Sequence, residues 1–479
     1  MTPPRRLLVI ADVGGDTTRH IGDEAMLEAN IEGLRDSFER VEIVVMSRDP
    51  KWISTRYGVD AVPLFGFPEA KDATDEREAL LTRLKAAAPS VHPSHPALEA
   101  LRSADAVVIS GGGNLSSSWP DLLWERIAAL ALAKLLGKPA IVLGQTLGPH
   151  LEDLERVALG DALATAAFVG VRDLPSAALA VALGVSPRRI WYQADDALKL
   201  GELLEGSHAT NGSEPSIVVT IDPQFRAIGT GRVRSLARQL RQLAEESGAT
   251  CVLVPHAFGT DSGAGSSDSA EAALLAEEIG LRSTVIATGL QARDAARLTR
   301  TATLVVSSRY HPIVFAVASG TPCIGIYGNE YCRIKIEGAL AHAGLLANAL
   351  SYDDVIRGAV LDLGRRLLRS GKASDHEAGA LRARWRDESQ RRWLAVRHAI
   401  VDGTTSERPE EGSLLGRQPS ELVPQLLATI ECGRAASVRL ERRLEDVTRI
   451  AIALERMARP WLAARRFASR VYRTFRRHE

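Results

Sequence analysis

Short apolar runs alternate along the chain with longer segments whose apolar positions recur every three to four residues. The short runs end at glycine or polar residues, as buried strands do, whereas the longer segments have helical periodicity. The predicted strands are Leu7–Ala11, Val41–Met46, Ala106–Ser110, Ala140–Gly144, Phe168–Val171, Ile190–Gln193, Ile217–Ile221, Cys251–Val254, Thr284–Ala287, Thr303–Ser307 and Cys323–Tyr327. The predicted helices include Gly22–Arg35, Leu122–Leu136, Pro175–Leu183, Arg232–Ser247 and Ser269–Ile279. Strands that alternate with helices in this way indicate an α/β architecture with parallel sheets.

A polar stretch rich in glycine and serine divides these strands into two series. It covers residues 201–215 and has the composition of an interdomain linker. We therefore expect two Rossmann-like α/β domains, residues 1–200 and residues 216–400, the second with trailing helices. Ligands of open parallel sheets bind beyond the carboxyl ends of the strands. Two such domains facing each other predict a cleft lined by the loops that follow the strands.

The C-terminal part of the chain has a different character. Residues 401–418 are polar and predict a second linker, and residues 419–479 predict a helical basic tail. Within the tail, Leu440, Leu444 and Val447 begin the 4–3 spacing of a coiled-coil seam, which a helical hairpin would also produce. Residues 459–479 carry seven arginines among aromatic and aliphatic residues. This segment suits an anionic membrane surface or an acidic partner, although its aromatic residues could instead pack on the body of the protein.

Charge and cysteine content narrow the class of protein. The formal net charge is zero, so no overall field attracts nucleic acid, and we expect no nucleic-acid partner. The four cysteines form no C-x-x-C pair and indicate reduced thiols rather than a disulfide framework. The apolar run at Leu7–Ala11 is shorter than the about 7–15 residues of a signal peptide core. We expect a cytoplasmic protein that is at most peripheral at the inner face of the membrane.

Glycine-rich loops follow several predicted strands. The first runs from Asp12 to Asp16 and leads to Ile21–Ala25, where Asp23 either supports a helix N-terminus or faces a ligand. The second contains Gly111, Gly112 and Gly113, followed by Asn114 and, further on, Asp121. Three consecutive glycines are entropically costly, which favours a close approach of substrate or of the opposing domain. The first loop does not have the G-x-G-x-x-G pattern of a dinucleotide site.

Further polar residues lie at other strand ends. Gln145 could hydrogen-bond a hydroxylated ligand or belong to an ordinary turn. Arg172 is suited to bidentate binding of a carboxylate or phosphate, or to a structural ion pair with a neighbouring acid. The pair Asp195–Asp196 lacks a third ligand at metal-binding spacing, so we expect capping or sugar binding there and no metal.

The most specific motif is Ser307–Pro312, between a predicted strand and an apolar helix. Arg309 and His311 are two residues apart in this turn and can project to the same side. Arginine holds an oxyanion, and histidine exchanges a proton near neutral pH. Further along the chain, Arg333 and Lys335 are expected to extend the positive lining. Such a cleft suits a small, multiply anionic donor and a neutral, hydroxyl-rich acceptor.

In their order and spacing, these motifs resemble those of the polysaccharide pyruvyl transferases. The resemblance covers roughly residues 5–345 and implies a fold like that of the two-domain GT-B glycosyltransferases. It is carried by Ile21–Ala25, Gly111–Gly113, Gly144–Pro149, Val171–Asp173, Asp195–Ala197, Ser308–His311 and Gly320–Pro322. The chain departs from the family at His20, where members usually have Asn, and at Ser116–Ser118, which delay the acidic residue after the glycines.

The resemblance implies transfer of the enolpyruvyl group of phosphoenolpyruvate to a sugar of a cell-surface polysaccharide or glycolipid, the acceptor, as a pyruvate ketal. Arg172 and Arg309 would hold the donor anions with help from Lys335, and His311 would protonate the donor methylene. Asp23 or Asp121 would orient or deprotonate the acceptor hydroxyls, without cofactor or metal. The other residues expected to bind substrate are Arg333, Gly111, Gly112, Gly113, Asn114, Gln145 and Ser308.

Two other functions remain open at this point. A GT-B-type glycosyltransferase that uses a nucleotide sugar would share the architecture and the basic residues. A non-catalytic scaffold of a glycan-assembly complex would use the C-terminal tail to dock on a membrane or a partner.

Overall fold

A computed structural model describes eight ranges of the chain. They are residues 4–14, 18–90, 95–202, 214–227, 230–259, 268–282, 284–373 and 375–402. The predicted basic tail, residues 419–479, lies outside these ranges, as do nearly all of the second linker and most of the first. Within the described residues, no helix is both long enough and apolar enough to cross a membrane.

The first domain is built on a parallel sheet whose strands follow the order β4-β3-β1-β5-β7-β8-β9, with β6 paired to β7. These strands are β1 (Arg6–Ile10), β3 (Glu42–Ser47), β4 (Asp60–Pro63), β5 (Ala106–Ile109), β6 (Gly112–Leu115), β7 (Ala140–Leu147), β8 (Phe168–Val171) and β9 (Ile190–Tyr192). Its helices are α1 (Ile21–Ser37), α2 (Pro50–Tyr57), α3 (Thr74–Ala87), α4 (Pro96–Ser103), α5 (Pro120–Leu135), α6 (Asp153–Leu163) and α7 (Leu174–Ala182), with the 3-10 turn Pro187–Arg189.

The second domain repeats this architecture with a sheet of order β13-β11-β10-β14-β15-β16, again parallel. Its strands are β10 (Ser216–Thr220), β11 (Thr250–Leu253), β13 (Thr284–Ile286), β14 (Leu304–Ser307), β15 (Cys323–Tyr327) and β16 (Ala349–Ser351). Its helices are α8 (Leu198–Glu202), α9 (Gln224–Ala227), α10 (Thr230–Ser247), α11 (Asp268–Ile279), α12 (Ala292–Thr301), α13 (Tyr310–Ser319), α14 (Glu330–Ala341), α15 (Tyr352–Ile356) and α16 (Ala359–Ser370), with the 3-10 turn Leu346–Asn348.

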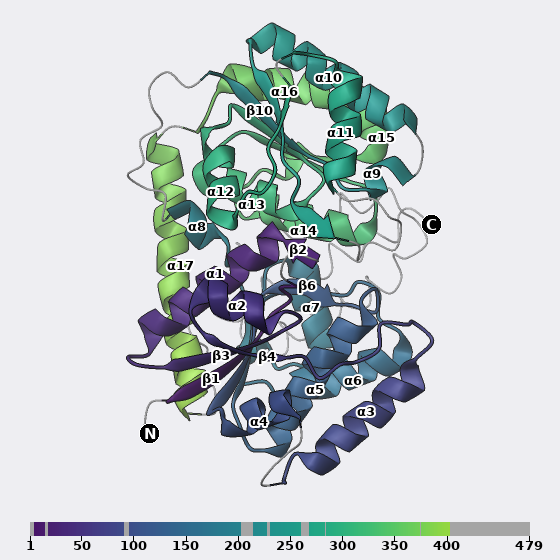
Figure 1. Ribbon diagram of the computed structural model, residues 1–479. Helices are drawn as coiled ribbons and strands as arrows, with labels where there is room; N and C mark the ends of the chain where they lie inside the picture. Colours follow the sequence, from purple (N-terminus) through teal and green to yellow (C-terminus); the bar gives the residue numbers. More distant parts are fainter. Residues whose placement is uncertain are drawn as a thin grey trace, which may run out of the picture.

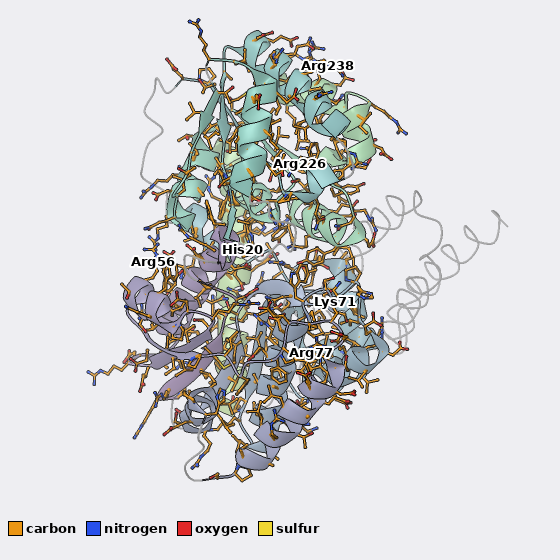
Figure 2. All side chains as sticks on the ribbon, turned by 45° about the vertical axis from the view of Figure 1, so that its right-hand side comes forward. His20, Arg56, Lys71, Arg77, Arg226 and Arg238 are labelled. Atoms are coloured by element: carbon orange, nitrogen blue, oxygen red, sulfur yellow. The ribbon has the colours of Figure 1, made fainter. Side chains whose placement is uncertain are left out.

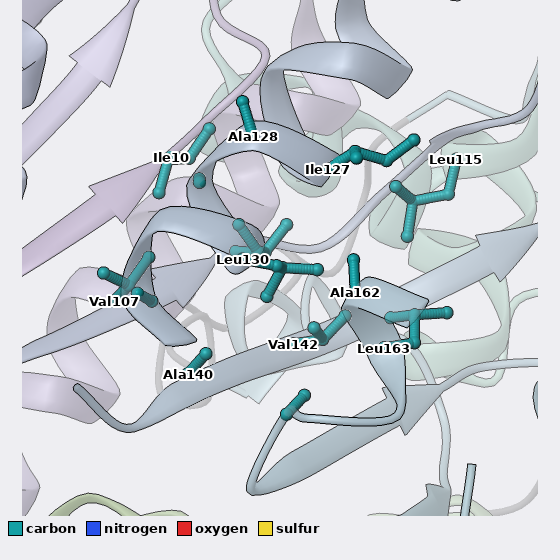
Figure 3. Packing of buried hydrophobic residues seen from close by; sticks show 14 of the residues in the cluster. Ile10, Val107, Leu115, Ile127, Ala128, Leu130, Ala140, Val142, Ala162 and Leu163 are labelled. Atoms are coloured by element: carbon teal, nitrogen blue, oxygen red, sulfur yellow. The ribbon is translucent and has the colours of Figure 1, made fainter. Parts of the chain in front are cut away.

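The inner strands of each sheet are buried on both faces, which explains why they are continuous apolar runs. In β1, Leu8 and Ile10 belong to one core cluster of the first domain, and Leu7 and Val9 belong to the cluster on the other face. Figure 3 shows the first cluster, where Val107 of β5 and Val142 of β7 lie near helix residues such as Leu130. Side chains that point alternately to the two faces of the sheet are all buried only if helices cover both faces.

Two elements connect the domains (Figure 1). Strand β2 (Thr18–His20) of the first domain pairs antiparallel with β12 (Ala257–Gly259) of the second. Helix α17 (Asp375–Asp402) runs along both domains, with Trp385 in a core cluster of the second and Val396 in a cluster of the first. The helix that ends the predicted second domain therefore also packs on the first.

Candidate active site

The turn after β14 brings Arg309 and His311 to the junction between the two domains. The Ser307 hydroxyl accepts the Arg309 N–H at 3.0 Å and donates to the Arg309 carbonyl at 2.8 Å. Arg309 is the N-cap of α13, which places Tyr310 and His311 in the first turn of this helix. The local hydrogen bonds therefore fix the direction in which both predicted residues leave the strand.

Arg309 forms a two-pronged ion pair with Asp268 at the start of α11. Its Nε lies 3.1 Å from Asp268 Oδ2, and its Nη2 lies 2.6 Å from Oδ1. The Asp268 side chain is fully buried. This carboxylate raises the pKa of Arg309 despite the opposing effect of burial. Arg309 is thus a fixed positive charge, and its Nη1 takes no part in the pair.

His311 lies directly against the backbone of Gly22. A Cβ atom at Gly22 would be 1.7 Å from His311 Nδ1, so only glycine fits at this position. The Nε2 atom is buried without a hydrogen-bond partner among the described residues, 3.9 Å from Asp195 Oδ1. Burial, and then the charges of Arg172 and Lys335, hold the pKa of His311 well below its usual value of 6.5. The imidazole is therefore neutral at neutral pH in the absence of ligand.

Arg172, at the end of β8, is held by a buried network. Its Nη1 donates to Asp195 Oδ2 at 2.7 Å and its Nε donates to Thr146 Oγ1 at 3.0 Å. The guanidinium lies 4.4 Å from the centre of the Tyr310 ring. The Arg172 side chain is only 1% exposed, so its orientation is set by the protein rather than by solvent.

Lys335 of α14 lies near the other side of this cluster. Its Nζ is 5.4 Å from the centre of the Tyr310 ring and donates to the Tyr331 hydroxyl at 3.1 Å. Burial, followed by repulsion from Arg172, lowers the pKa of Lys335 to about 8. A neighbouring anion would restore its full charge.

Asp23 lies in the first turn of α1, within electrostatic reach of these cations. Burial, together with the charge of Asp12, raises the pKa of the Asp23 carboxyl to about 7, against the attraction of Lys335 and Arg172. A carboxyl with this pKa can accept or donate a proton at neutral pH. The structure therefore brings Arg172, Lys335, Asp23 and His311 into one electrostatic cluster.

The three glycines of the triplet have different close neighbours, which leave little or no room for a side chain. A Cβ atom at Gly111 would lie 2.9 Å from Met26 Sδ and 3.0 Å from Asp196 Oδ2, which are packed below the loop. A Cβ atom at Gly113 would lie 2.3 Å from the Tyr331 hydroxyl. At Gly112 it would meet Asn114 Oδ1 at 3.3 Å.

The Gly113 position is also where the two cations converge. A Cβ atom there would lie 3.2 Å from both Arg172 Nη2 and Lys335 Nζ. The Tyr331 hydroxyl donates to the Gly113 carbonyl at 2.7 Å, which joins the two domains at this point.

Two further predicted residues lie on the first-domain side. Asp121 accepts from Arg48 Nη2 at 2.7 Å, and burial raises its pKa. Asn114 donates to Asp12 at 2.7 Å, and its Oδ1 is buried without a partner among the described residues. Arg48 also lies 3.9 Å from Asp12. These polar groups form a band that leads from Asp121 towards Asp23.

Three predicted residues serve the scaffold instead. Arg333 does not extend the positive cluster, because its guanidinium pairs with Glu330 and Glu337 of its own helix, each at 3.0 Å. Two residues along an α-helix correspond to roughly 200° of rotation, so Arg333 points away from Lys335. Gln145 donates to the Ser110 carbonyl at 2.5 Å, and the Ser308 hydroxyl donates to Asp222 at 2.7 Å.

Several residues of the cluster were not among the predicted site residues. His20 lies at the junction of the domains (Figure 2), and burial followed by the charge of Arg309 lowers its pKa. Burial lowers the pKa of His256 to about 4. Tyr310 and Tyr331 supply the rings beside Arg172 and Lys335. Tyr310 stands inside the predicted motif, and His20 was visible as a departure from the family pattern. His256 and Tyr331 carry no comparable signal.

The adjacent Asp195 and Asp196 are held by different arginines. Asp195 pairs with Arg172, and Asp196 pairs with Arg392 of α17. Within the described residues, no group of three histidine, cysteine, aspartate or glutamate side chains could hold a metal ion. The acidic pair therefore neutralises buried arginines.

Comparisons with solved structures bear on the fold. The chain is similar to a putative UDP-N-acetylglucosamine 2-epimerase from Listeria monocytogenes, with a TM-score of 0.54 and 15% identity over 85% of this chain and 98% of that one. An S. aureus MnaA–UDP complex gives a TM-score of 0.53 and 11% identity over 84% and 100% of the two chains. At these identities the likeness concerns the fold alone, which is GT-B-like.

Comparisons of sequence bear on the family. No curated protein sequence matches the chain. The family model for polysaccharide pyruvyl transferase matches residues 20–330, more than half of the chain, and spans the Gly22, Gly111–Gly113, Arg172 and Arg309–His311 motifs. The chain therefore belongs to the polysaccharide pyruvyl transferase family.

Proposed function

We propose that the protein transfers the enolpyruvyl unit of phosphoenolpyruvate to two hydroxyls of one sugar residue, forming a pyruvate ketal and releasing phosphate. The acceptor is a sugar of a cell-surface polysaccharide or glycolipid. The observation that supports this most is the grouping of Arg172 and Lys335 with Asp23 and His311 at the domain junction. It combines two cations for an anionic donor with two groups that can exchange protons.

The cations suit the two anionic groups of phosphoenolpyruvate. Arg172 and Lys335 converge at Gly113 and would hold one group, while Arg309 would hold the other through Nη1. The ion pair with Asp268 keeps Arg309 in place before the donor arrives, so little ordering is needed on binding. Lys335, with a pKa of about 8, becomes fully charged when the anion binds.

His311 would supply the proton for the donor methylene. Its neutral state without ligand follows from burial and from the neighbouring cations. The negative charge of the bound donor offsets these cations and raises the pKa of the imidazole, which then takes up a proton. Transfer of this proton to C3 makes a methyl group and leaves C2 electrophilic.

Asp23 would accept the proton of the attacking sugar hydroxyl. The first hydroxyl oxygen forms a bond to C2, the bond from C2 to the phosphate oxygen then breaks, and the second hydroxyl closes the ketal. One proton ends on the new methyl group. Two hydroxyl protons are released, of which one replaces the proton given by His311 and the other leaves with phosphate. No step uses a metal or a cofactor.

The donor distinguishes this proposal from its rival, a nucleotide-sugar glycosyltransferase with the same fold. The purified protein is incubated with phosphoenolpyruvate or with UDP-sugars, each with cell-surface polysaccharide from the source organism that mild acid has stripped of ketals. We expect polysaccharide-dependent release of phosphate from phosphoenolpyruvate. Release of UDP without release of phosphate would favour the glycosyltransferase.

A lipid-linked acceptor would bring the enzyme to the inner face of the membrane. Residues 459–479 would then supply the membrane contact through their arginines and aromatic residues.

A further inference from the structure

Trp119 occupies an unusual place at the start of α5. It is the N-cap residue of this helix and makes no side-chain capping hydrogen bond. Polar residues, whose side chains accept a hydrogen bond from the first turn of the helix, are preferred at this position. Among the described residues, Trp119 is the only phenylalanine, tyrosine or tryptophan in the exposed class, at 37%. An exposed indole at an unfavourable helix position indicates a role outside local stability.

The Trp119 ring packs against Tyr331, which in turn contacts Lys335, one of the donor cations of the proposed mechanism. Its centre lies 5.0 Å from the centre of the Tyr331 ring, at an interplanar angle of 52°. Tyr331 in turn binds the Gly113 carbonyl and receives the Lys335 ammonium hydrogen bond. Trp119 therefore lies at the rim of the candidate active site, where its ring contacts Tyr331 of the second domain.

Polar groups continue from Trp119 towards the proposed base. Asp121 is two residues further on and pairs with Arg48, which also approaches Asp12. Asp12 in turn contributes to the electrostatic environment of Asp23. This side of the site thus combines an apolar ring face with hydrogen-bonding carboxylates.

A pyranose ring has the matching chemistry. One face presents C–H groups that pack on an aromatic surface, and the rim presents hydroxyls that bind carboxylates. Phosphoenolpyruvate is too small and too charged to need an indole surface. The band from Trp119 to Asp23 is therefore suited to the acceptor rather than to the donor.

We propose that Trp119 is the stacking surface for the acceptor sugar and that Asp121 binds a hydroxyl of the stacked ring. This assignment rests on the proposed pyruvyl transfer, which it extends by placing the acceptor on the first-domain side of the site. The stacked ring then directs its hydroxyls towards Asp23 and the donor C2.

The test compares Trp119→Ala and Trp119→Phe with the control Ile286→Ala. Ile286 has the same 37% exposure but lies on β13, the edge strand of the second sheet. Binding of ketal-stripped polysaccharide is measured by biolayer interferometry without phosphoenolpyruvate, and phosphoenolpyruvate binding is measured separately by calorimetry. Thermal unfolding confirms that each variant is folded.

We expect Trp119→Ala to weaken polysaccharide binding at least tenfold, Trp119→Phe to weaken it less than threefold, and Ile286→Ala to leave it unchanged. Phosphoenolpyruvate binding should be unchanged in all three variants. Wild-type polysaccharide affinity in Trp119→Ala would overturn the assignment, as would an equal loss of both ligands. If the wild-type protein binds polysaccharide but releases no phosphate, the proposed function fails while the binding comparison still decides the role of Trp119.

Discussion

His311 can occupy its position only because residue 22 is glycine and has no side-chain carbon. Because a Cβ atom there would lie 1.7 Å from Nδ1, Gly22→Ala must displace the imidazole. A displacement of about 1 Å at a reacting group can cost 100-fold in rate, so we expect at least this loss of pyruvyl transfer. Overpacking should cost only about 1–3 kcal/mol of stability.

The matched control for this change is Gly231→Ala. Gly231 is an exposed residue of α10 with no atom near its would-be Cβ, and alanine is the better helix former there. It should keep full activity and unchanged or slightly higher stability. Gly22→Ala activity within threefold of wild type would contradict the proposed placement of His311.

The raised pKa of Asp23 predicts a specific pH dependence of stability. Its pKa is about 7 in the folded protein, against 3.8 for an exposed aspartate carboxyl. The folded state therefore holds the proton more tightly, and this contribution is complete below about pH 4 and lost as pH rises through about 7. The Asp23→Asn protein should lack this loss.

The measurement is the free energy of unfolding by urea at several values between pH 4.5 and 8. As pH increases, the free energy of unfolding of the wild-type protein should fall relative to that of Asp23→Asn. Because other titrating groups are common to both proteins, a difference that is independent of pH would show that Asp23 has an ordinary pKa.

The strand-end motifs were sufficient to predict that Arg172, Arg309, His311 and Asp23 lie at the junction of the domains, because the carboxyl ends of parallel strands meet at one edge of each sheet. Partners distant in sequence could not be found in this way. Asp268 is 41 residues from Arg309, and nothing in the local pattern links them. Arg333 was expected to line the cleft but pairs within its own helix. Its basic character alone does not tell on which face of the helix it lies.

At the scale of elements, the predicted strands of both sheets agree closely with the structure, because strands buried on both faces must be apolar throughout. Strands β2, β4, β6, β12 and β16 were not predicted. Each is only three or four residues long, and β2 and β12 pair with each other across the domains. Their formation depends on tertiary contact rather than on a local pattern.

Helix α17 is attached to the first domain by the ion pair between Arg392 and Asp196. Both side chains are at least nine-tenths buried, and Asp196 lies against Gly111 and Gly144. Arg392→Met leaves this buried carboxylate unpaired, which should reduce the free energy of unfolding by about 3–5 kcal/mol. Denaturant unfolding gives the value.

The neighbouring Arg391 provides the control. It pairs with Asp387 at 2.8 Å on a partly exposed face of the same helix. Arg391→Ala should cost at most about 1 kcal/mol. A double variant, Arg392→Met with Asp196→Asn, should recover part of the loss. Equal costs for Arg391→Ala and Arg392→Met would contradict the structural importance of the buried pair.

At the scale of the whole molecule, the two domains are held by contacts on opposite sides of the site. Arg293 of α12 pairs with Glu28 and Glu32 of α1, while the Tyr331 hydroxyl binds the Gly113 carbonyl. Helix α17 adds a connection that packs on both domains. The candidate site therefore requires both domains, and all of its residues lie within residues 1–400.

This arrangement predicts the effect of removing residues 405–479. The truncated enzyme should release phosphate from phosphoenolpyruvate with stripped polysaccharide at a rate within threefold of the full chain. It should lose most of its binding to vesicles that contain anionic lipid, which sedimentation measures. Complete loss of turnover by a folded truncated protein would contradict the placement of the whole site within residues 1–400.

In the proposed reaction, the donor methylene is protonated and its C2 becomes the ketal carbon. The most direct test is reaction of [3-¹³C]phosphoenolpyruvate with stripped polysaccharide in D₂O, followed by NMR of the product. We predict a polysaccharide-bound ketal methyl group that carries one deuterium, and no such product with the His311→Ala protein. A product without this methyl signal, or an equal yield from His311→Ala, would contradict the account.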